Sequence, residues 1–281
     1  MPNTALRWML PVSIVVLFAA VAIAQPTKNP EPIKVVKPIK LFDGKTLTGF
    51  YTRLKETKYK DPEGVFSVRD GNIHITGDGF GGLITTQAYK DYHLVFEFKW
   101  GPRTWGQREK SARDSGIMFH VTGAEDALGG WLPEAFQCQL QEGGTGDFYV
   151  VKARGPVALS ATCEVGIKNR KRYYKAGGKK QTLTRGGINY SKRDPNWKNE
   201  LNFRGANDPD SPVGQWTRCE VICKGDTATL KVNGTTTVVA TNLKPAAGKV
   251  WIQCEGAELL IRRFDLYPIG KAPKLGPVKQ D

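Results

Sequence analysis

Apolar and polar residues alternate over short runs along most of the chain, which is the pattern of β-strands with one buried face. The clearest run is 92–100 (YHLVFEFKW), where four apolar side chains share one face and Lys99 lies on the other. Asp70-Gly71 and Asn233-Gly234 separate such runs, and both dipeptides favour hairpin turns. No long stretch has the period of an amphipathic helix. The pattern predicts an all-β, two-sheet antiparallel sandwich of the jelly-roll type.

Two of these runs, 114–121 (DSGIMFHV) and 136–142 (FQCQLQE), flank a glycine-containing loop. Strand side chains alternate, so Met118 and His120 should share one face of the first run. The same rule places three amides on one face of the second run: Gln137, Gln139 and Gln141. Buried amides need hydrogen-bonding partners, and sugar hydroxyls can supply them. A solvated face of an edge strand explains the spacing equally well.

The 281 residues, 40% of them hydrophobic, fit one large domain with a sizeable core. Residues 1–24 have the features of a cleaved signal peptide: Arg7, an apolar run and the small-x-small sequence Ala22-Ile23-Ala24. We therefore expect a secreted or periplasmic protein with no stable membrane span after processing. Residues 25–38 form a Pro/Lys-rich linker, 39–268 the sandwich, and 269–281 a flexible tail.

The formal net charge is +14, and much of the excess lies at 168–193, within a basic insertion at about 152–212. No nucleic-acid motif accompanies it, so we expect no nucleic-acid partner. The segment could instead attract an anionic polysaccharide, or it could be a solvated loop. The five cysteines have no metal-binding spacing. Export would permit disulfides, but the odd count leaves at least one thiol over, and most of the five are expected to be small buried hydrophobic residues.

Six short segments occur in a characteristic order: 41–45 (LFDGK), 114–117 (DSGI), 139–142 (QLQE), 214–216 (GQW), 233–234 (NG) and 252–258 (IQCEGAE). The ordered set resembles the 3-keto-disaccharide hydrolase domain, formerly the domain of unknown function 1080, over about residues 39–267. Its members are also described as 3-keto-glucoside 1,2-lyase and 3-keto-2-hydroxyglucal hydratase. The resemblance implies a concanavalin-like β-sandwich, exported members and sugars oxidised at C3. The chain departs from the family pattern at Asp114, His120 and Gln137, where Asn, Arg and Glu are frequent.

A ketone at C3 makes the C2 hydrogen acidic, so the implied reaction begins with removal of that proton. The glycosidic oxygen then leaves C1 by elimination, and water adds back to give net hydrolysis. This chemistry needs a base, donors at the enolate oxygen, and an acid or metal at the leaving group. It does not need the two opposed carboxylates of ordinary glycosidases.

His120 is the first choice for the base because its ordinary pKa suits the task, although a structural histidine is the alternative. Glu142 and Asp147 bracket the loop 143–146 and could supply the acid, or could bind a divalent cation such as calcium. They could equally cap turns. Lys99 could stabilise the enolate or simply face solvent.

Five further residues are candidates for contacts with an oligosaccharide or 3-keto-glycoside substrate: Gln137, Gln139, Gln141, Trp131 and Arg113. The indole of Trp131 could stack on a pyranose ring or anchor its loop, and Arg113 could instead form an ion pair within its loop. Glu255 is expected to cap a turn. The sequence thus predicts an exported enzyme that cleaves 3-keto-glycosides, with a noncatalytic carbohydrate-binding module as the alternative.

Overall fold

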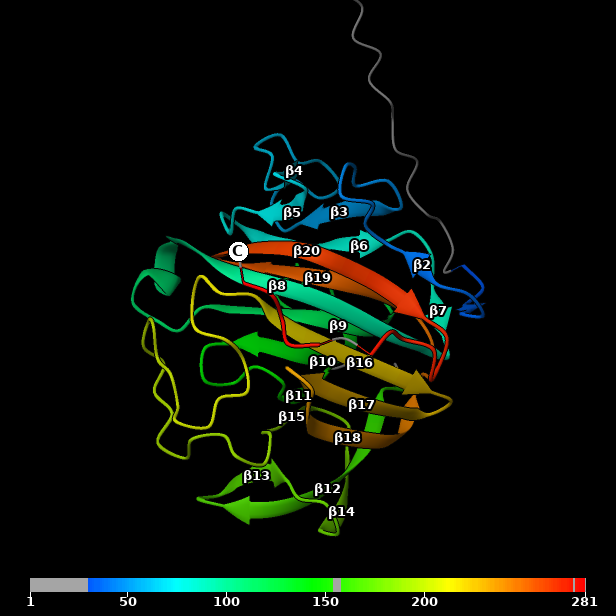
Figure 1. The fold of residues 1–281 in the computed structure, drawn as a ribbon, viewed down its shortest axis with the longest axis vertical. Coiled ribbons are helices and arrows are strands. Elements are labelled where there is room, and N and C mark those ends of the chain that lie inside the picture. Colours follow the sequence, from blue (N-terminus) through cyan, green and yellow to red (C-terminus); the bar gives the residue numbers. More distant parts are fainter. Residues whose placement is uncertain (1–29, 154–157, 275, 281) are drawn as a thin grey trace, which may run out of the picture.

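The computed structural model describes residues 30–153, 158–274 and 276–280, so the signal peptide predicted for 1–24 lies outside the described residues. Two antiparallel sheets pack face to face (Figure 1). The smaller sheet has seven strands, in the spatial order β15 (Gly186–Ile188), β11 (Phe148–Val151), β10 (Glu134–Gln141), β9 (Asp114–Thr122), β19 (Lys249–Glu255), β6 (Phe80–Thr85) and β3 (Phe50–Leu54).

The larger sheet follows the order β13 (Lys171–Tyr174), β12 (Ser160–Lys168), β18 (Thr235–Lys244), β17 (Thr227–Val232), β16 (Thr217–Lys224), β8 (Tyr92–Thr104), β20 (Ala257–Tyr267), β5 (Asn72–Ile75) and β4 (Phe66–Arg69). β14 (Lys179–Leu183) pairs with β12, and β2 (Ile39–Lys40) pairs with β20. Outside the two sheets, β1 (Ile33–Lys34) pairs in parallel with β7 (Tyr89–Lys90). The chain also forms the 3-10 helix η1 (Gly106–Glu109).

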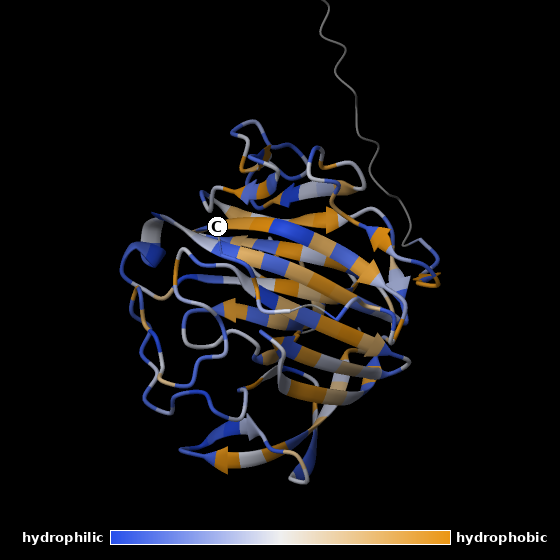
Figure 2. Cartoon of the chain, viewed as in Figure 1, coloured by the Kyte–Doolittle hydropathy of each residue, from blue (hydrophilic) through white to orange (hydrophobic). Residues whose placement is uncertain are grey.

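The core lies between the two sheets and follows directly from the alternation in the sequence. Hydrophobic and hydrophilic residues alternate along the strands (Figure 2). Phe96 and Phe98 of β8 enter one hydrophobic cluster with Ile117 and Phe119 of β9, from the facing sheet. Burying an aromatic or aliphatic side chain of this size stabilises the fold by about 2 kcal/mol. The predicted concanavalin-like, jelly-roll sandwich is therefore confirmed.

The two predicted hairpins also form. Asn233 and Gly234 join β17 to β18 with φ angles of +44° and +82°, the left-handed conformations that a type I′ turn requires. Asp70 and Gly71 join β4 to β5 in the same way. All five cysteines are buried and unpaired, so the expectation made for most of them holds for all five.

Both ends of the described chain differ from the sequence-based prediction. Within the segment predicted as a linker, Ile33–Lys34 pairs with β7. The tail predicted to be flexible lies against the larger sheet, where Lys279 accepts a hydrogen bond from Arg262 at 2.8 Å and Gln280 accepts one from the Trp216 N–H at 2.7 Å. Backbone hydrogen bonds to β7 hold the first segment, and hydrogen bonds to Arg262 and Trp216 hold the second. None of the helices in the described part of the chain is long and apolar enough to cross a membrane.

Candidate functional site

The outer face of the seven-stranded sheet carries the predicted row of glutamines. The antiparallel register places Gln141 opposite Asp114 and Gln139 opposite Gly116. A Cβ atom on Gly116 would lie 2.5 Å from the Gln137 amide, so the glycine leaves room for that side chain to lie along the sheet. Adjacent β19 contributes Gln253 and Glu255 to this face, because its alternate residues Ile252 and Cys254 enter the core.

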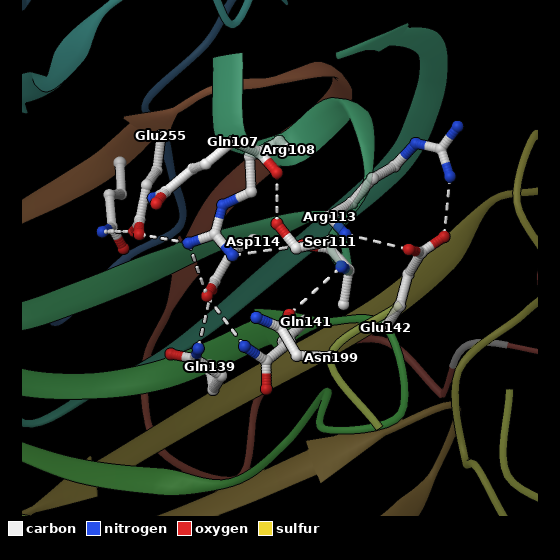
Figure 3. Close-up of polar contacts among 12 residues, drawn as sticks. Gln107, Arg108, Ser111, Arg113, Asp114, Gln139, Gln141, Glu142, Asn199 and Glu255 are labelled. Atoms are coloured by element: carbon white, nitrogen blue, oxygen red, sulfur yellow. Dashed lines mark hydrogen bonds and ion pairs between the residues drawn. The ribbon is translucent and has the colours of Figure 1, made fainter. Parts of the chain in front are cut away.

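Asp114 is the centre of the resulting polar network. Its carboxylate accepts hydrogen bonds from Gln139 Nε2 at 2.7 Å, Gln141 Nε2 at 2.8 Å and Arg108 Nη2 at 3.0 Å (Figure 3). The same Arg108 nitrogen also donates to Glu255, which places one guanidinium between two carboxylates. Arg108 comes from η1, the short 3-10 helix between β8 and β9 in the chain, and its side chain is buried.

The remaining amides close this network into a ring. Gln253 donates to Glu255, and Gln137 donates both to Gln139 and, at 3.4 Å, to Gln253. Each of the three glutamines predicted from the sequence therefore takes part in the network, since Gln141 bonds Asp114 directly. Amides that are already oriented in this way can exchange a protein partner for a sugar hydroxyl without leaving a buried polar group unsatisfied.

The charges of this network favour a retained proton. Burial raises the pKa of Asp114 well above its ordinary value, the nearby Glu255 charge raises it further, and Arg108 opposes both effects. Burial also raises the pKa of Glu255, again against Arg108. One arginine cannot fully compensate two buried carboxylates, so the pair titrates as a unit and readily holds one proton.

An aromatic rim lies beside Glu255. Phe80 of β6 is its register partner, and the Phe80 and Trp131 rings meet edge to face with centroids 5.1 Å apart. Both side chains are partly exposed. Aromatic faces next to polar groups are the surfaces on which pyranose rings pack, so the position of Trp131 fits the predicted sugar contact.

Arg193 extends the network at the opposite side of the glutamine row. Its Nη2 donates to Gln141 at 3.1 Å, while its Nη1 pairs with Asp147. Asp147 also accepts the Tyr190 backbone N–H at 2.7 Å. Burial raises the pKa of Asp147 to about 7 although Arg193 opposes this shift. Asp147 thus reaches the glutamine face only through Arg193.

His120 lies on the wrong side of the sheet for the predicted role of base. Strand β9 has one extra residue here: Phe119 to Thr122 spans what Phe136 to Glu134 spans on β10. The resulting bulge and a φ of +52° turn His120 into the core, against Tyr92 and Phe136. Burial lowers its pKa to about 4. A fully buried histidine between the sheets cannot reach a sugar on the outer face, and simple alternation failed because of the bulge.

Glu142 and Arg113 bind each other rather than the glutamine face (Figure 3). Glu142 accepts hydrogen bonds from Arg113 Nη1 at 2.7 Å, the Arg113 N–H at 2.8 Å and the Asn202 N–H at 3.0 Å. These three donors fix a loop, so the structure does not support Glu142 as the acid or Arg113 as a substrate contact.

The proposed cation site does not fit this arrangement either. The Glu142 oxygens already bind the Arg113 and Asn202 donors, and Asp147 is paired with Arg193. Across residues 30–153, 158–274 and 276–280 there is no group of three or more His, Cys, Asp or Glu side chains that could hold a metal ion. Calcium binding by these two carboxylates would require their arginine partners to leave.

Lys99 lies on the outer face of the other sheet, with its ammonium 4.6 Å from the centroid of the Trp216 ring. The structure therefore does not bring Lys99 together with the glutamine face. Sequence reasoning in turn missed Arg108, Gln253 and Glu255. The spacing of Gln253 and Glu255 places both on one strand face, but only the neighbouring strand β9 shows that this face joins Asp114.

A β-sandwich with amides and carboxylates beside an aromatic rim has the features of a carbohydrate site. Residues 37–266 match the 3-keto-alpha-glucoside-1,2-lyase-like domain, and the protein belongs to this family. The membership confirms the resemblance found in the six sequence segments. It supports a carbohydrate-related function.

Several solved structures are similar to this chain at low sequence identity. A candidate glycosyl hydrolase from Parabacteroides distasonis ATCC 8503 is 18% identical, with 83% of this chain and 94% of that chain covered and a TM-score of 0.47. Carbohydrate-binding module CBM66 from Bacillus subtilis is 8% identical, with 78% and 95% covered and a TM-score of 0.45. The β-glucanase of Bacillus licheniformis is 10% identical, with 82% and 97% covered and a TM-score of 0.42. No curated protein matches the chain in sequence.

Proposed function

We propose that the glutamine face binds a 3-keto-glycoside and that Asp114 and Glu255 carry out the proton transfers of its cleavage. The observation that carries this proposal is the pair of buried carboxylates sharing Arg108. A pair that holds one proton contains both a base and an acid, which a 1,2-elimination requires. Family membership supplies the substrate class.

Asp114 is the base in this proposal because it lies at the centre of the glutamine row, where Gln139, Gln141 and Arg108 all bond its carboxylate. It takes the C2 proton, and the C2–H electrons form the enolate of the C3 ketone. Glu255 donates its proton to the glycosidic oxygen as the C1–O bond breaks. Water then adds at C1 of the unsaturated sugar and C2 regains a proton, so the sum of the two steps is hydrolysis.

The neighbouring groups position the substrate and stabilise charge. Arg108 can donate to the enolate oxygen, since its guanidinium already lies between the two carboxylates. Gln137, Gln139 and Gln141 provide amides for sugar hydroxyls, and Trp131 provides a face for the ring. No step passes through His120, Glu142 or Lys99.

Turnover of a 3-keto-disaccharide, followed by the enone absorbance and by released sugar, tests this proposal. Asp114→Asn should lower the turnover rate about 10²–10⁴-fold, the usual contribution of a positioned base. Asp265→Asn is the matched control, a buried aspartate of β20 that bonds Arg263 and Tyr267 on the other sheet. No turnover by the wild-type protein, or equal loss in both variants, would contradict the assignment.

A noncatalytic carbohydrate-binding module remains the second candidate, and Gln137 is the observation that favours it. An amide stands where the family often has a carboxylate, and it donates only to Gln139 and Gln253. Saturable binding of an unoxidised oligosaccharide, without product from any 3-keto-glycoside, would establish this candidate over the enzyme.

Export is part of the proposal and rests on the sequence of residues 1–24 alone. Expression of the full chain in a secreting host should give a mature protein that begins at Gln25. N-terminal sequencing measures this directly, and a mature protein that retains Met1 would contradict it.

A further inference from the structure

A basic cavity of about 350 Å³ lies at the β15 edge of the seven-stranded sheet. Four basic side chains and one indole contribute to its lining, which consists of Tyr149, Arg170, Lys171, Arg172, Gly187, Asn189, Arg193 and Trp197. No acidic side chain lines it. The volume is in the range of pockets that hold small ligands, about 300–1,000 Å³.

The floor of this cavity is a continuation of the glutamine face. Gln137 pairs in register with Tyr149, and Tyr149 pairs with Gly187 on β15. Since neighbouring strands lie about 4.8 Å apart, Gly187 is about 10 Å from Gln137, the width of one or two sugar units. A Cβ atom at Gly187 would lie 2.5 Å from the Tyr149 ring, so the glycine leaves room for that ring to lie over β15 and form part of the cavity wall.

Three of the four positive charges in the cavity are not balanced by a carboxylate of the described residues. Arg193 has its own carboxylate, Asp147, and its guanidinium carbon lies 4.8 Å from the centroid of the Trp197 ring. By contrast, Arg170, Lys171 and Arg172 form no salt bridge with any of the residues that the structure describes. Three uncompensated cations beside an indole favour a ligand that has both negative charge and a flat apolar face.

We propose that this cavity is a subsite for an acidic sugar unit, a uronate or a sulfated residue, adjoining the unit that is cleaved. The inference rests on the proposed function for its assumption that the glutamine face binds sugar. Arg170 and Arg172 bind the carboxylate or sulfate, Trp197 packs on the ring, and Arg193 links the subsite to Gln141 and thereby to Asp114. Acidic oligosaccharides are therefore the preferred ligands of this protein.

Calorimetric titration of the intact mature protein tests the subsite with three unoxidised disaccharides: glucuronosyl-glucose, its neutral counterpart cellobiose, and a sulfated cellobiose. At an ionic strength of about 0.02 M, where charges are weakly screened, at least one acidic ligand should bind about tenfold more tightly than cellobiose. The preference should shrink at about 0.3 M salt. The ranking of the two acidic ligands distinguishes uronate from sulfate, and equal affinity for all three overturns the proposal.

Two charge-matched variants locate the effect. Arg170→Ala with Arg172→Ala should abolish the acidic preference, while Lys179→Ala with Lys224→Ala, two exposed strand residues outside the cavity, should keep it. The exposed Lys171→Gln change should weaken acidic binding about threefold even if the double variant folds poorly. Equal losses in both double variants would show a diffuse charge effect and overturn the subsite.

The titration does not depend on turnover, so the two proposals can fail separately. Cleavage of a neutral 3-keto-disaccharide together with equal binding of acidic and neutral sugars would overturn the subsite alone. An acidic preference that depends on Arg170 and Arg172, in a protein without turnover, would overturn the enzyme and support the subsite.

Discussion

The outer faces of the two sheets each contain a buried cluster of carboxylates and arginines, in opposite proportions. On the larger sheet, Glu97 accepts hydrogen bonds from Arg218 at 2.9 Å and Arg262 at 2.7 Å, and Arg263 lies 3.8 Å away. On the smaller sheet, Asp114 and Glu255 share Arg108. In the first cluster three arginines surround Glu97 and one of them also pairs with Asp265, whereas in the second cluster two carboxylates share one arginine.

The pKa shifts follow these proportions. Burial alone would raise the pKa of Glu97, but hydrogen bonds from Arg262 and Arg218 and their charges bring it below its ordinary value. The pKa of Asp114 is raised because its single arginine does not offset burial and the Glu255 charge. The first cluster is fixed in one protonation state, while the second is able to gain and lose a proton.

The two clusters also differ in what covers them. The C-terminal segment covers the Glu97 cluster, where Gly276 accepts from Arg218 at 2.9 Å and Lys279 accepts from Arg262 at 2.8 Å. The Asp114 cluster is bordered by the partly exposed ring of Trp131. A cluster covered by its own chain stabilises the fold, whereas one bordered by a partly exposed aromatic ring fits the proposed role in binding a ligand.

The largest expected effect separates the two clusters by activity. Glu255→Gln should lower turnover of a 3-keto-disaccharide about 10³-fold, because it removes the proposed acid without changing the shape of the side chain. Glu97→Gln, the same change on the other sheet, should leave turnover within about twofold. Steady-state rates of both purified variants measure this. Comparable turnover rates in Glu255→Gln and Glu97→Gln would show that the two clusters do not differ in their contribution to activity.

The next effect is on stability. Arg108→Met leaves two buried carboxylates without a cation and should cost about 3–5 kcal/mol at pH 7. Arg218→Met should cost less, about 1–2 kcal/mol, because Glu97 keeps Arg262. Urea unfolding at neutral pH measures both free energies. A larger cost for Arg218→Met would show that the proportion of charges does not govern these clusters.

Acidification should change the folding stability contributed by the two clusters in opposite directions. A carboxyl whose folded pKa is lowered stabilises the fold above its unfolded pKa and loses that contribution as the pH falls through the folded value. The roughly 2 kcal/mol cost of Glu97→Gln at pH 7 should therefore shrink on acidification. A carboxyl whose folded pKa is raised destabilises the folded state as the pH rises. The unfolding free energy lost in Arg108→Met should therefore also be smaller at low pH, where Asp114 and Glu255 are both protonated.

Unfolding curves from about pH 7 to pH 3 test these slopes. In the wild-type protein, the Asp114 and Glu255 pair alone would make the folded state more stable at low pH than at neutral pH. Glu97 alone would make it less stable at low pH. Glu97→Gln should thus flatten the acid limb of the wild-type curve. An unchanged acid limb in that variant would contradict the lowered pKa of Glu97.

The smallest effect concerns Lys99. Its ammonium lies over Trp216 on the outer face of the larger sheet, so Lys99→Met should change the unfolding free energy by less than about 1 kcal/mol. Turnover should be unchanged, since the residue is on the opposite sheet from Asp114. A loss of turnover in Lys99→Met, with stability retained, would place the active site on the larger sheet instead.

Much of the fold could be predicted because its signals are local. A period of two decides which side chains of 92–100 and 136–142 share a face, and Asn-Gly or Asp-Gly decides where hairpins turn. Phe96 and Phe98 lie in the core, and all three glutamines lie on the outer face, as alternation requires. Family membership was also predictable from six ordered segments.

The site was harder to predict because it depends on exceptions and on distant partners. One extra residue in β9 turned His120 into the core, and no local signal marks that bulge. Glu142 follows a strand residue of the network, yet it binds Arg113 and Asn202. Glu255 was expected to cap a turn, because nothing near it in the sequence shows that β19 lies beside β9.

The sequence by itself determined the alternation, the hairpins, the glutamine row and the family, since each depends on residues close together in the chain. Only the tertiary structure decided that Asp114, Arg108 and Glu255 meet, because strand neighbours are set by long-range packing of the sheets. The proton-holding pair arises from that meeting. Burial raises the pKa of each carboxyl, and the shared arginine compensates only part of their combined charge.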